Sequence, residues 1–298
     1  MKYVRPDFYD SFKCKASDCR HSCCMGWEID IDADTLELYS RIPGRIGREL
    51  KKNISNDGTP HFILKKDESC PFLRADGLCR LIAELGEEAL CDICTEHPRF
   101  YNYVSDREEA GLGLCCEEAV RLLLERDGPL NFEIYTDDEE CDADDTLIEL
   151  RDRLFGILSD EGRTLYERMK MCMNILECEL PEFDARGLAE VMMGLEILDP
   201  AWNEYLNALK MFCGDIKSAL SGMKYQRLVQ YFVYRHFACA DADPRQNLYF
   251  AMVSTEIICA LELCGFDLAE TIRMYSAEIE YAEENTSAIK EKYMVSPK

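Results

Sequence analysis

The sequence predicts a mostly helical protein with a cysteine-rich, metal-binding N-terminal module that contains short β elements. Two contrasts along the 298 residues lead to this fold class. Ten of the 17 cysteines lie within the first 116 residues, whereas the chain beyond residue 146 shows apolar residues at helical spacing almost throughout. Hydrophobic residues make up 47% of the chain, which is enough to build a core without disulfide staples.

The N-terminal module is expected over residues 1–135. Candidate strands in it are "WEIDID" at 27–32, "HFILKK" at 61–66 and "FEIYT" at 132–136, because β-branched and aromatic residues recur in them. Asp32 or Asp34 is expected to cap a short helix that follows, and "EEAVRLLLER" after residue 116 predicts another helix.

An acidic stretch, "TDDEECDADDT" at 136–146, is expected to link this module to a helical domain over residues 147–298. Leucines spaced by three and four residues predict the first helix of that domain and its buried stripe: Leu147, Leu150, Leu154 and Leu158. The seven cysteines beyond residue 116 are scattered singly, often among apolar residues, and are expected to pack in the core.

Charge and hydropathy narrow the partners and the compartment. The net charge is −24, with 21 acidic and 16 basic residues up to residue 116 and 37 and 18 beyond it. Such acidity argues against binding of nucleic acid. The charge either keeps the protein in solution or attracts a lysine-bearing partner. No signal peptide and no run of 18 apolar residues is present. We therefore expect a cytoplasmic protein without a membrane anchor, whose thiols stay reduced.

The first 116 residues show cysteines at metal-ligand spacing: C-x4-C-x3-C-C from Cys14, then C-x8-C, C-x2-C and a final pair. Buried reduced cysteines and disulfides are the alternatives, but clustering at these spacings favours a metal. Thiolates suit zinc or an iron–sulfur cluster. Ten thiols exceed the need of one tetrahedral zinc, so the count favours a polynuclear centre.

The stretches "FKCKASDCRHSCCMGWEIDID", "CPFLRADGLC", "LGEEALCDICTEHPRFY" and "CCEEAVRLLL" resemble the flagellin lysine-N-methylase family, whose front part is related to putative zinc- or iron-chelating proteins. "YQRLVQYFVYRHF" and "YSAEIEYAEENTSAI" resemble its C-terminal signature stretches. The resemblance implies S-adenosylmethionine-dependent methylation of lysine side chains on flagellin, and a [4Fe-4S] cluster, with zinc as the alternative metal. The alternative function is a non-catalytic iron- or zinc-chelating or metal-delivery protein.

Carried over by position, the resemblance implies a ligand set of nine cysteines: Cys14, Cys19, Cys23, Cys24, Cys70, Cys79, Cys91, Cys94 and Cys116. The sequence departs from the family pattern at "LGLCCEEA", where the family tends to have serine before the cysteine and proline after it. Cys115 is therefore expected to be an extra thiol, and Glu117 stands in the position of the proline.

No motif identifies a methyl-donor site. Gly111-x-Gly113 precedes a helix, but no βαβ pattern surrounds it, so the match is attributed to chance. Lysine methylation requires a deprotonated amine, and thus a desolvating site or a base. The candidates for this role lie in the helical half of the chain. A buried Arg235 needs a carboxylate partner, which Glu280 or Glu278 could supply. The residues chosen are Tyr231, Arg235, His236 and Glu280.

Overall fold

The computed structural model describes residues 1–55, 57–136, 144–238 and 243–292. The chain divides into two compact units. Residues 13–99 form the smaller unit, and residues 1–12 together with 100–298 form the larger one. The linker expected at residues 136–146 stays a prediction, because residues 137–143 lie outside the described part of the chain. The smaller unit is thus an insertion after the first strand of the larger unit.

The smaller unit contains short elements around a small core. Its helices are α1 (Ala33–Arg41), α2 (Gly44–Lys52), α3 (Arg80–Leu85) and α4 (Asp92–Glu96), and its two-stranded sheet pairs β2 (Ile54–Ser55) with β3 (His61–Phe62). The expected strand at 61–66 is therefore only two residues long. The expected strand at 27–32 does not form, and only an isolated bridge joins Asp30 to His61. The predicted cap is confirmed, because the Asp32 carboxylate accepts a hydrogen bond from the Thr35 amide at 2.8 Å.

The larger unit begins with a four-stranded mixed sheet in the order β4-β5-β1-β6. Its strands are β1 (Lys2–Pro6), β4 (Arg99–Val104), β5 (Arg107–Leu112) and β6 (Phe132–Thr136). Strand β1 pairs in parallel with β5 and antiparallel with β6, with Lys2 opposite Arg107 on one side and Thr136 on the other. The predicted strand at 132–136 is confirmed.

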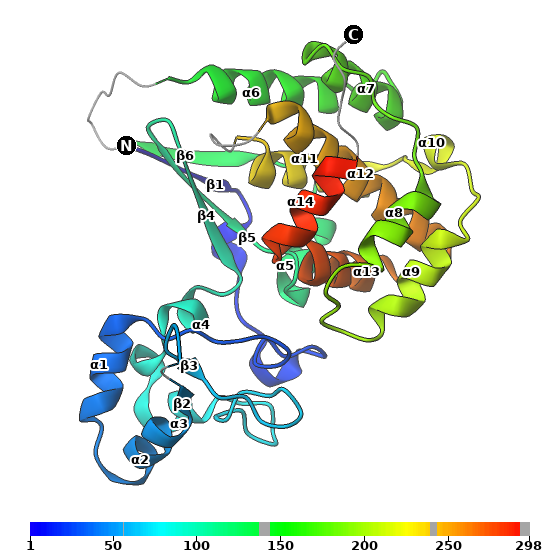
Figure 1. The fold of residues 1–298 in the computed structure, drawn as a ribbon. Helices are drawn as coiled ribbons and strands as arrows, with labels where there is room; N and C mark the ends of the chain where they lie inside the picture. The colour runs from blue at the N-terminus through cyan, green and yellow to red at the C-terminus, as the bar shows by residue number, and fades with distance from the viewer. Residues whose placement is uncertain (56, 137–143, 239–242, 293–298) are drawn as a thin grey trace. The chain divides into compact units, whose positions relative to one another are not determined.

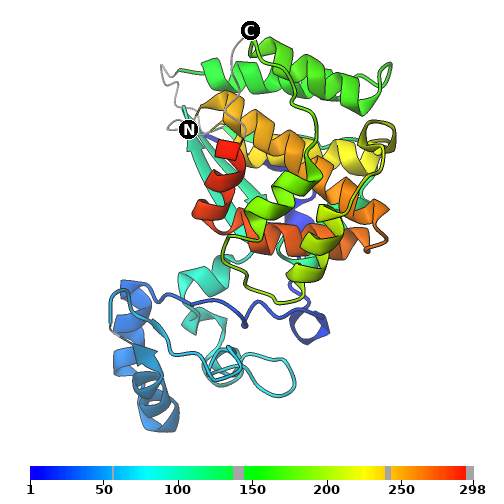
Figure 2. The same cartoon turned by 45° about the vertical axis from the view of Figure 1, so that its right-hand side comes forward.

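Ten helices of the larger unit are described, and Figures 1 and 2 show most of them gathered around α11 and α12, which pack against each other. They are α5 (Glu117–Glu125), α6 (Thr146–Leu158), α7 (Leu165–Ile175), α8 (Ala185–Met192), α9 (Trp202–Lys210), α10 (Ile216–Ala219), α11 (Met223–His236), α12 (Pro244–Leu263), α13 (Leu268–Tyr275) and α14 (Glu283–Lys292). Helix α12 is buried on every side from Asn247 to Leu261, as a helix at the centre of a core must be. None of the described helices combines the length and the apolar character needed to cross a membrane.

Helix α6 shows how the buried face of a helix differs from the one that its sequence pattern predicts. Helix α6 buries Ile148, Arg151, Leu154 and Leu158. Leu154 and Leu158 follow the predicted stripe, whereas Leu147 and Leu150 are only partly buried. An arginine occupies the second position of the buried face, and Glu109 of β5 lies opposite it. Among the scattered cysteines, Cys172, Cys178 and Cys259 are buried as expected. The expectation is wrong for Cys213 and Cys264, which are exposed, and Cys141 and Cys239 lie outside the described residues.

Candidate functional site: a thiol cluster and a buried ionic cluster

Five of the nine predicted ligand cysteines gather around the core of the smaller unit. Cys70 and Cys91 are part of that core, and three further thiols pack against it: Cys24, Cys79 and Cys94. Long-range backbone contacts bring the segments together, since the Cys70 amide donates to the Cys24 carbonyl at 2.8 Å. The thiols also lie within electrostatic range of one another. Burial, together with the neighbouring Cys24 and Cys79, raises the pKa of Cys70 to about 12.

The pair Cys91 and Cys94 is held by a helix start. Cys91 is the N-cap of α4, the Cys94 amide donates to its carbonyl at 3.0 Å, and the two thiols share a hydrogen bond. The Asp32 carboxylate accepts a hydrogen bond from the Asp92 amide at 3.0 Å, in addition to capping α1. Burial disfavours its ionised form, but hydrogen bonds from the Asp92 and Thr35 amides outweigh burial and lower the pKa of Asp32. One carboxylate thus fixes the starts of two helices beside the thiols.

The other three cysteines of this unit lie on a loop nearer the surface: Cys14, Cys19 and Cys23. The Cys14 sulfur accepts a hydrogen bond from the Ala16 amide at 3.4 Å. Trp27 donates from its indole nitrogen to the Cys23 carbonyl at 2.6 Å, and its ring lies 5.8 Å from that of His97. The half-buried Trp27 therefore holds the loop that carries Cys23 next to His97.

The donor chemistry of five converging thiols fits a thiolate-bound metal. Among the residues that the structure describes, no three cysteine, histidine, aspartate or glutamate side chains stand at the spacing of a completed metal site. The sulfurs are brought together instead as neighbours in a small core. Cys115 and Cys116 belong to the larger unit, where Cys116 is the N-cap of α5.

The larger unit contains a second cluster, which unites the four residues chosen as catalytic candidates. Arg235 donates to the Tyr231 hydroxyl at 2.7 Å and lies 3.4 Å from the Glu280 carboxylate. His236 Nε2 lies 2.7 Å from the same carboxylate oxygen, Glu280 Oε1. The Glu280 side chain is fully buried, its other oxygen, Oε2, has no partner within hydrogen-bond distance, and the Ser276 hydroxyl also interacts with this carboxylate. In the sequence Glu280 lies 44 residues after His236 and 45 after Arg235, and the fold joins them.

The helix that carries Glu280 departs from α geometry. A π-helical segment, η4 (Ser276–Glu280), follows α13 directly, and α14 starts again at Glu283. A π-helical turn rotates the residues after it relative to an α-helix, and such turns occur often at functional sites. Here Glu280 faces α11, whereas Glu278 accepts from the Leu198 and Asp199 amides at 3.0 and 2.7 Å. Of the two carboxylates considered for Arg235, Glu280 is the partner and Glu278 is not.

Aromatic rings cover the Arg235 guanidinium on two sides. Its central carbon lies 4.7 Å from the Phe100 ring centre and 4.9 Å from that of Tyr281. Tyr281 is 44% exposed, so it connects the buried cluster with the surface, and its hydroxyl shares a hydrogen bond with the Cys115 thiol. Sequence patterns gave no signal for Phe100 or Cys115 as neighbours of Arg235, because both lie more than 100 residues away along the chain.

The electrostatics of the cluster favour an ionised carboxylate beside a neutral imidazole. Burial disfavours the charged form of Glu280, but the Arg235 charge and the His236 hydrogen bond outweigh it and lower the pKa of Glu280. Burial likewise lowers the pKa of His236, in spite of the carboxylate beside it. The arrangement can therefore hold a charged Arg235–Glu280 pair and an uncharged histidine in a desolvated site.

Gly111, the first glycine of the pair considered as a donor motif, has a packing role. Gly111 lies in β5, and a Cβ added to it would come within 2.2 Å of the Phe100 ring. The missing side chain makes room for the ring that covers Arg235. This explains Gly111 without a nucleotide, in agreement with the interpretation of the motif as chance.

Three curated proteins resemble the chain. Lysine-N-methylases of Salmonella typhimurium and Salmonella choleraesuis are each 32% identical over 135 residues, which cover 41% of this chain and 32% of theirs. The flagellar biosynthetic protein FliU of Salmonella muenchen is 32% identical over 129 residues, which cover 41% of this chain and 76% of its own.

These similarities show that the chain belongs to the flagellin lysine-N-methylase family. The match spans about a third of the length of the two lysine-N-methylases. No family model matches the chain. No solved structure matches it either.

Proposed function

We propose that this protein transfers methyl groups from S-adenosylmethionine to lysine side chains of flagellin or a similar surface protein in the cytoplasm. Membership of the family is the observation that carries the proposal, because two of the relatives are named lysine-N-methylases and the third is a flagellar protein. The ionic cluster of the larger unit supports it with a chemically suitable site. The methyl donor supplies an electrophilic methyl group, and we assign no residue to its binding.

The role proposed for the ionic cluster is to prepare the lysine amine. An ammonium group must lose its proton before its nitrogen can attack a methyl carbon, and burial favours that loss. Glu280 has a buried oxygen, Oε2, with no partner within hydrogen-bond distance, and its ionised carboxylate can pair with the incoming cation and orient it. Tyr231 and Arg235 would act as positioning residues that keep the carboxylate oriented, and His236 would hold its other oxygen.

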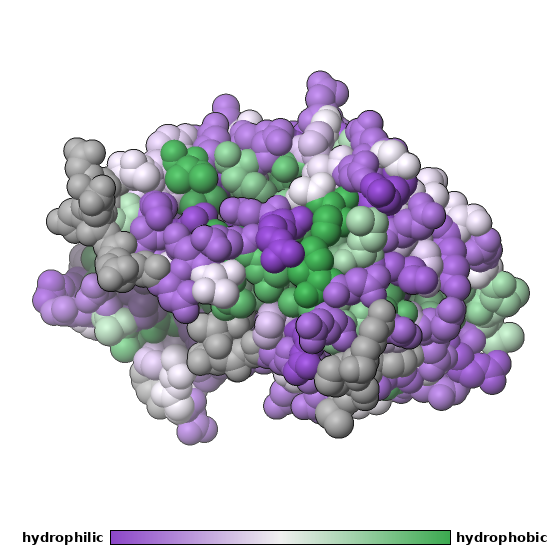
Figure 3. Space-filling model, turned by 90° about the horizontal axis from the view of Figure 1, so that it is seen from above, coloured by the Kyte–Doolittle hydropathy of each residue, from purple (hydrophilic) through white to green (hydrophobic). Residues whose placement is uncertain are grey.

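An acidic surface suits a lysine-bearing substrate. The larger unit contains most of the excess negative charge of the chain. Figure 3 shows a face of the molecule that is largely hydrophilic, with apolar side chains near its centre and in smaller patches elsewhere. Long-range attraction between opposite charges accelerates association, so this charge would favour encounter with lysines exposed on flagellin.

The methylation proposal is tested by incubating the anaerobically purified protein with flagellin and S-adenosylmethionine, followed by mass spectrometry of the lysines. We expect gains of 14 Da per methyl group, a mass set by the chemistry of replacing H by CH3. Glu280→Gln should lower the rate about 10²-fold, since it removes the charge that pairs with the lysine amine and orients it. Glu284→Gln, which changes an exposed carboxylate four residues later, should leave the rate unchanged.

Two results would contradict this proposal. One is unmodified lysines after incubation with the metal-loaded wild-type protein. The other is equal rates for wild type and a folded Glu280→Gln variant, as judged by circular dichroism. Tyr231→Phe is a second variant that keeps the Arg235–Glu280 pair, and it should lower the rate less than Glu280→Gln because it removes one hydrogen bond to the guanidinium.

We further propose that the cysteines of the smaller unit hold a [4Fe-4S] cluster, with zinc as the alternative. The five converging thiols would supply the inner ligands, and Cys14, Cys19 and Cys23 of the same unit would be the outer ones. Cys116, the ninth ligand that the family resemblance implies, belongs to the larger unit. Such a group would supply redox or structural chemistry when bound. Metal binding by a protein that leaves flagellin lysines unmodified would favour the alternative function, metal chelation or delivery.

Metal content tests this proposal by itself. Iron, sulfide and zinc should be measured in protein purified without oxygen, for the wild type, Cys91→Ser and Cys172→Ser. Both cysteines are fully buried, but Cys91 lies in the thiol cluster and Cys172 in the core of the larger unit. We expect Cys91→Ser to lose most of the metal and Cys172→Ser to keep it. Equal metal content in the two variants would rule out the thiol cluster as the site.

A further inference from the structure

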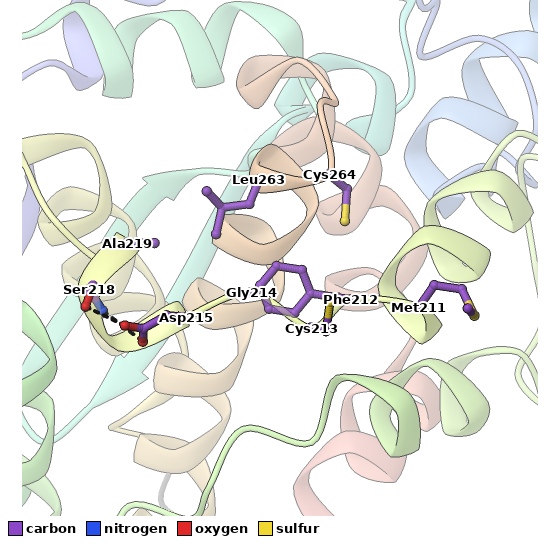
Figure 4. A pocket seen from close by; sticks show the side chains of 9 residues that line it. All are labelled: Met211, Phe212, Cys213, Gly214, Asp215, Ser218, Ala219, Leu263 and Cys264. Atoms are coloured by element: carbon purple, nitrogen blue, oxygen red, sulfur yellow. Dashed lines mark hydrogen bonds between the residues drawn. The ribbon is translucent and has the colours of Figure 1, made fainter.

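Two exposed thiols of the larger unit lie on one surface hollow, far along the chain from the N-terminal cysteines. Cys213 follows the end of α9, and Cys264 is the C-cap of α12. Both line a hollow of about 610 Å³, whose wall is otherwise mainly apolar and includes Met211, Phe212 and Leu263. In Figure 4 the sulfur of Cys264 points from the end of α12 toward the segment that carries Cys213.

Contacts with the last turn of α9 define where the Cys264 sulfur lies. The thiol donates a weak hydrogen bond to the Ala208 carbonyl at 3.8 Å. The chain then leaves α9 through Met211 and Phe212, whose amides donate back to Ala208 and Leu209 at 3.1 Å each. This turn brings Cys213 back toward the same end of α12. Partial burial raises the pKa of Cys264, and the negative charge of a Cys213 thiolate raises it further. The two thiols therefore lie within electrostatic range of each other.

The ends of both helices are fixed, which keeps the thiols together. The Cys264 amide donates to Ala260 and Leu261 at 3.0 and 3.1 Å, and Gly265 turns the chain with a φ of +99°. Cys259, one turn earlier on α12, is by contrast fully buried. One thiol lies on the loop after α9 and the other at the end of α12. Both are open to solvent and both line one hollow, which is the placement of a dithiol pair and not of core residues.

We propose that Cys213 and Cys264 form a redox-modifiable dithiol that closes to a disulfide with a low-molecular-weight disulfide such as oxidised glutathione. The Cys213 thiolate attacks one sulfur of the oxidant, forms a mixed disulfide and releases one thiolate. The Cys264 thiolate then attacks the Cys213 sulfur and releases the second. The protein loses two hydrogens as protons and two electrons, which reduce the oxidant to two thiols. Closure links α9 to α12 across the hollow.

The pair is expected to be reversible and not a permanent staple. Exposed disulfides are accessible to attack by thiolates and are more easily reduced than buried structural ones. In a reducing compartment such bonds are usually transient. The bond would form under oxidative conditions and would narrow the hollow, independently of the N-terminal thiols and of the methylation proposal.

The test is peptide mapping of the full-length protein after treatment with oxidised glutathione and alkylation of the remaining thiols. Trypsin releases Cys213 in residues 211–217 and Cys264 in residues 246–273, which also contain Cys259. We expect these two peptides to be cross-linked as the major product, with fragment ions that place the bond at Cys264. Dithiothreitol should reverse the cross-link. Cys213→Ser and Cys264→Ser should abolish it, and Cys259→Ser should retain it.

The proposal fails if Cys213 and Cys264 each carry glutathione, or remain free, without an internal cross-link. It also fails if, in Cys264→Ser, Cys213 forms disulfides with N-terminal cysteines. The yield that counts is one equal to that of the Cys213–Cys264 disulfide in the wild type. Dibromobimane, a reagent that fluoresces when it bridges two neighbouring thiols, gives a second readout that needs no oxidant. Its bridge between residues 211–217 and 246–273 should appear in the wild type and in Cys259→Ser, and be absent from the two single variants.

Discussion

Glu256→Gln should make the protein more stable than the wild type at pH 8, by about 4 kcal/mol, and by about 1 kcal/mol at pH 5. Glu256 lies in α12 with 1% of its surface exposed, and its Oε1 has no hydrogen-bond partner. Burial, and to a lesser extent Glu182, raise the pKa of Glu256 from 4.5 to about 8, against the opposing charge of Lys217. Ionising this carboxyl in the folded protein is therefore costly.

The sign of the effect follows from linkage. The folded-state pKa of Glu256 lies above its unfolded value, so the unfolded chain releases the proton first as the pH rises. Stability contributed by the neutral carboxyl is fully present below about pH 4.5 and is lost progressively up to about pH 8. Glutamine keeps the shape of the side chain and cannot ionise, so the variant should not show this fall.

Urea unfolding of both proteins between pH 5 and pH 8 measures the difference. Glu204→Gln makes the same chemical change at an exposed position of α9, where water solvates the carboxylate, and it should leave the fall between pH 5 and pH 8 in place. Parallel stability curves for the wild type and Glu256→Gln over this range would show that Glu256 does not titrate as a buried acid.

Arg151→Met should destabilise the larger unit by about 3–5 kcal/mol, because it leaves the Glu109 carboxylate buried without its partner. Arg151 of α6 donates two hydrogen bonds to Glu109 of β5, one of them at 2.6 Å, and the side chains are 4% and 0% exposed. The guanidinium also lies 5.3 Å from the ring centre of Tyr234. Tyr234 in turn donates to the carbonyls of Val4 and Ala110, so the pair is joined to the middle of the sheet.

A double variant distinguishes the loss of a partner from the loss of packing. Glu109→Leu combined with Arg151→Met removes both charges, and it should recover most of the stability lost by Arg151→Met. Arg163→Met breaks the exposed pair with Asp160 and should change the urea midpoint little. If the double variant is as unstable as Arg151→Met, the energetic cost lies in packing and not in the unpaired charge.

Local patterns in the sequence predict the helices well, but they predict contacts between distant residues poorly. Spacing of apolar residues located α6 and the helices after it, and the capping residue Asp32 was found because a cap acts within three residues. The predicted strand at 27–32 failed because a strand needs a partner, and the chain offers residues 27–32 only a single bridge. A pattern of alternating residues cannot show whether a neighbouring strand is available.

The candidate site was predictable in its residue types but not in its pairings. The apolar helix that carries Arg235 indicated that a carboxylate had to approach it, which follows from the cost of a buried unpaired charge. Choosing Glu280 over Glu278 required the π-helical turn of η4, which nothing in the spacing of residues 268–292 reveals. The seven later cysteines look alike in the sequence, and only the fold separates the exposed Cys213 and Cys264 from the buried ones.

The position of β1 has a consequence for the order of events during synthesis. This strand is made about a hundred residues before β5 and β6, yet it lies between them inside the sheet. Residues 13–99 leave the ribosome in between and have a core of their own. At about 5–20 residues per second, the residues of β1 wait unpaired for several seconds or more while the cysteine-rich insertion can already collapse. Binding of the metal proposed for that insertion would therefore be able to precede closure of the sheet into which it is inserted.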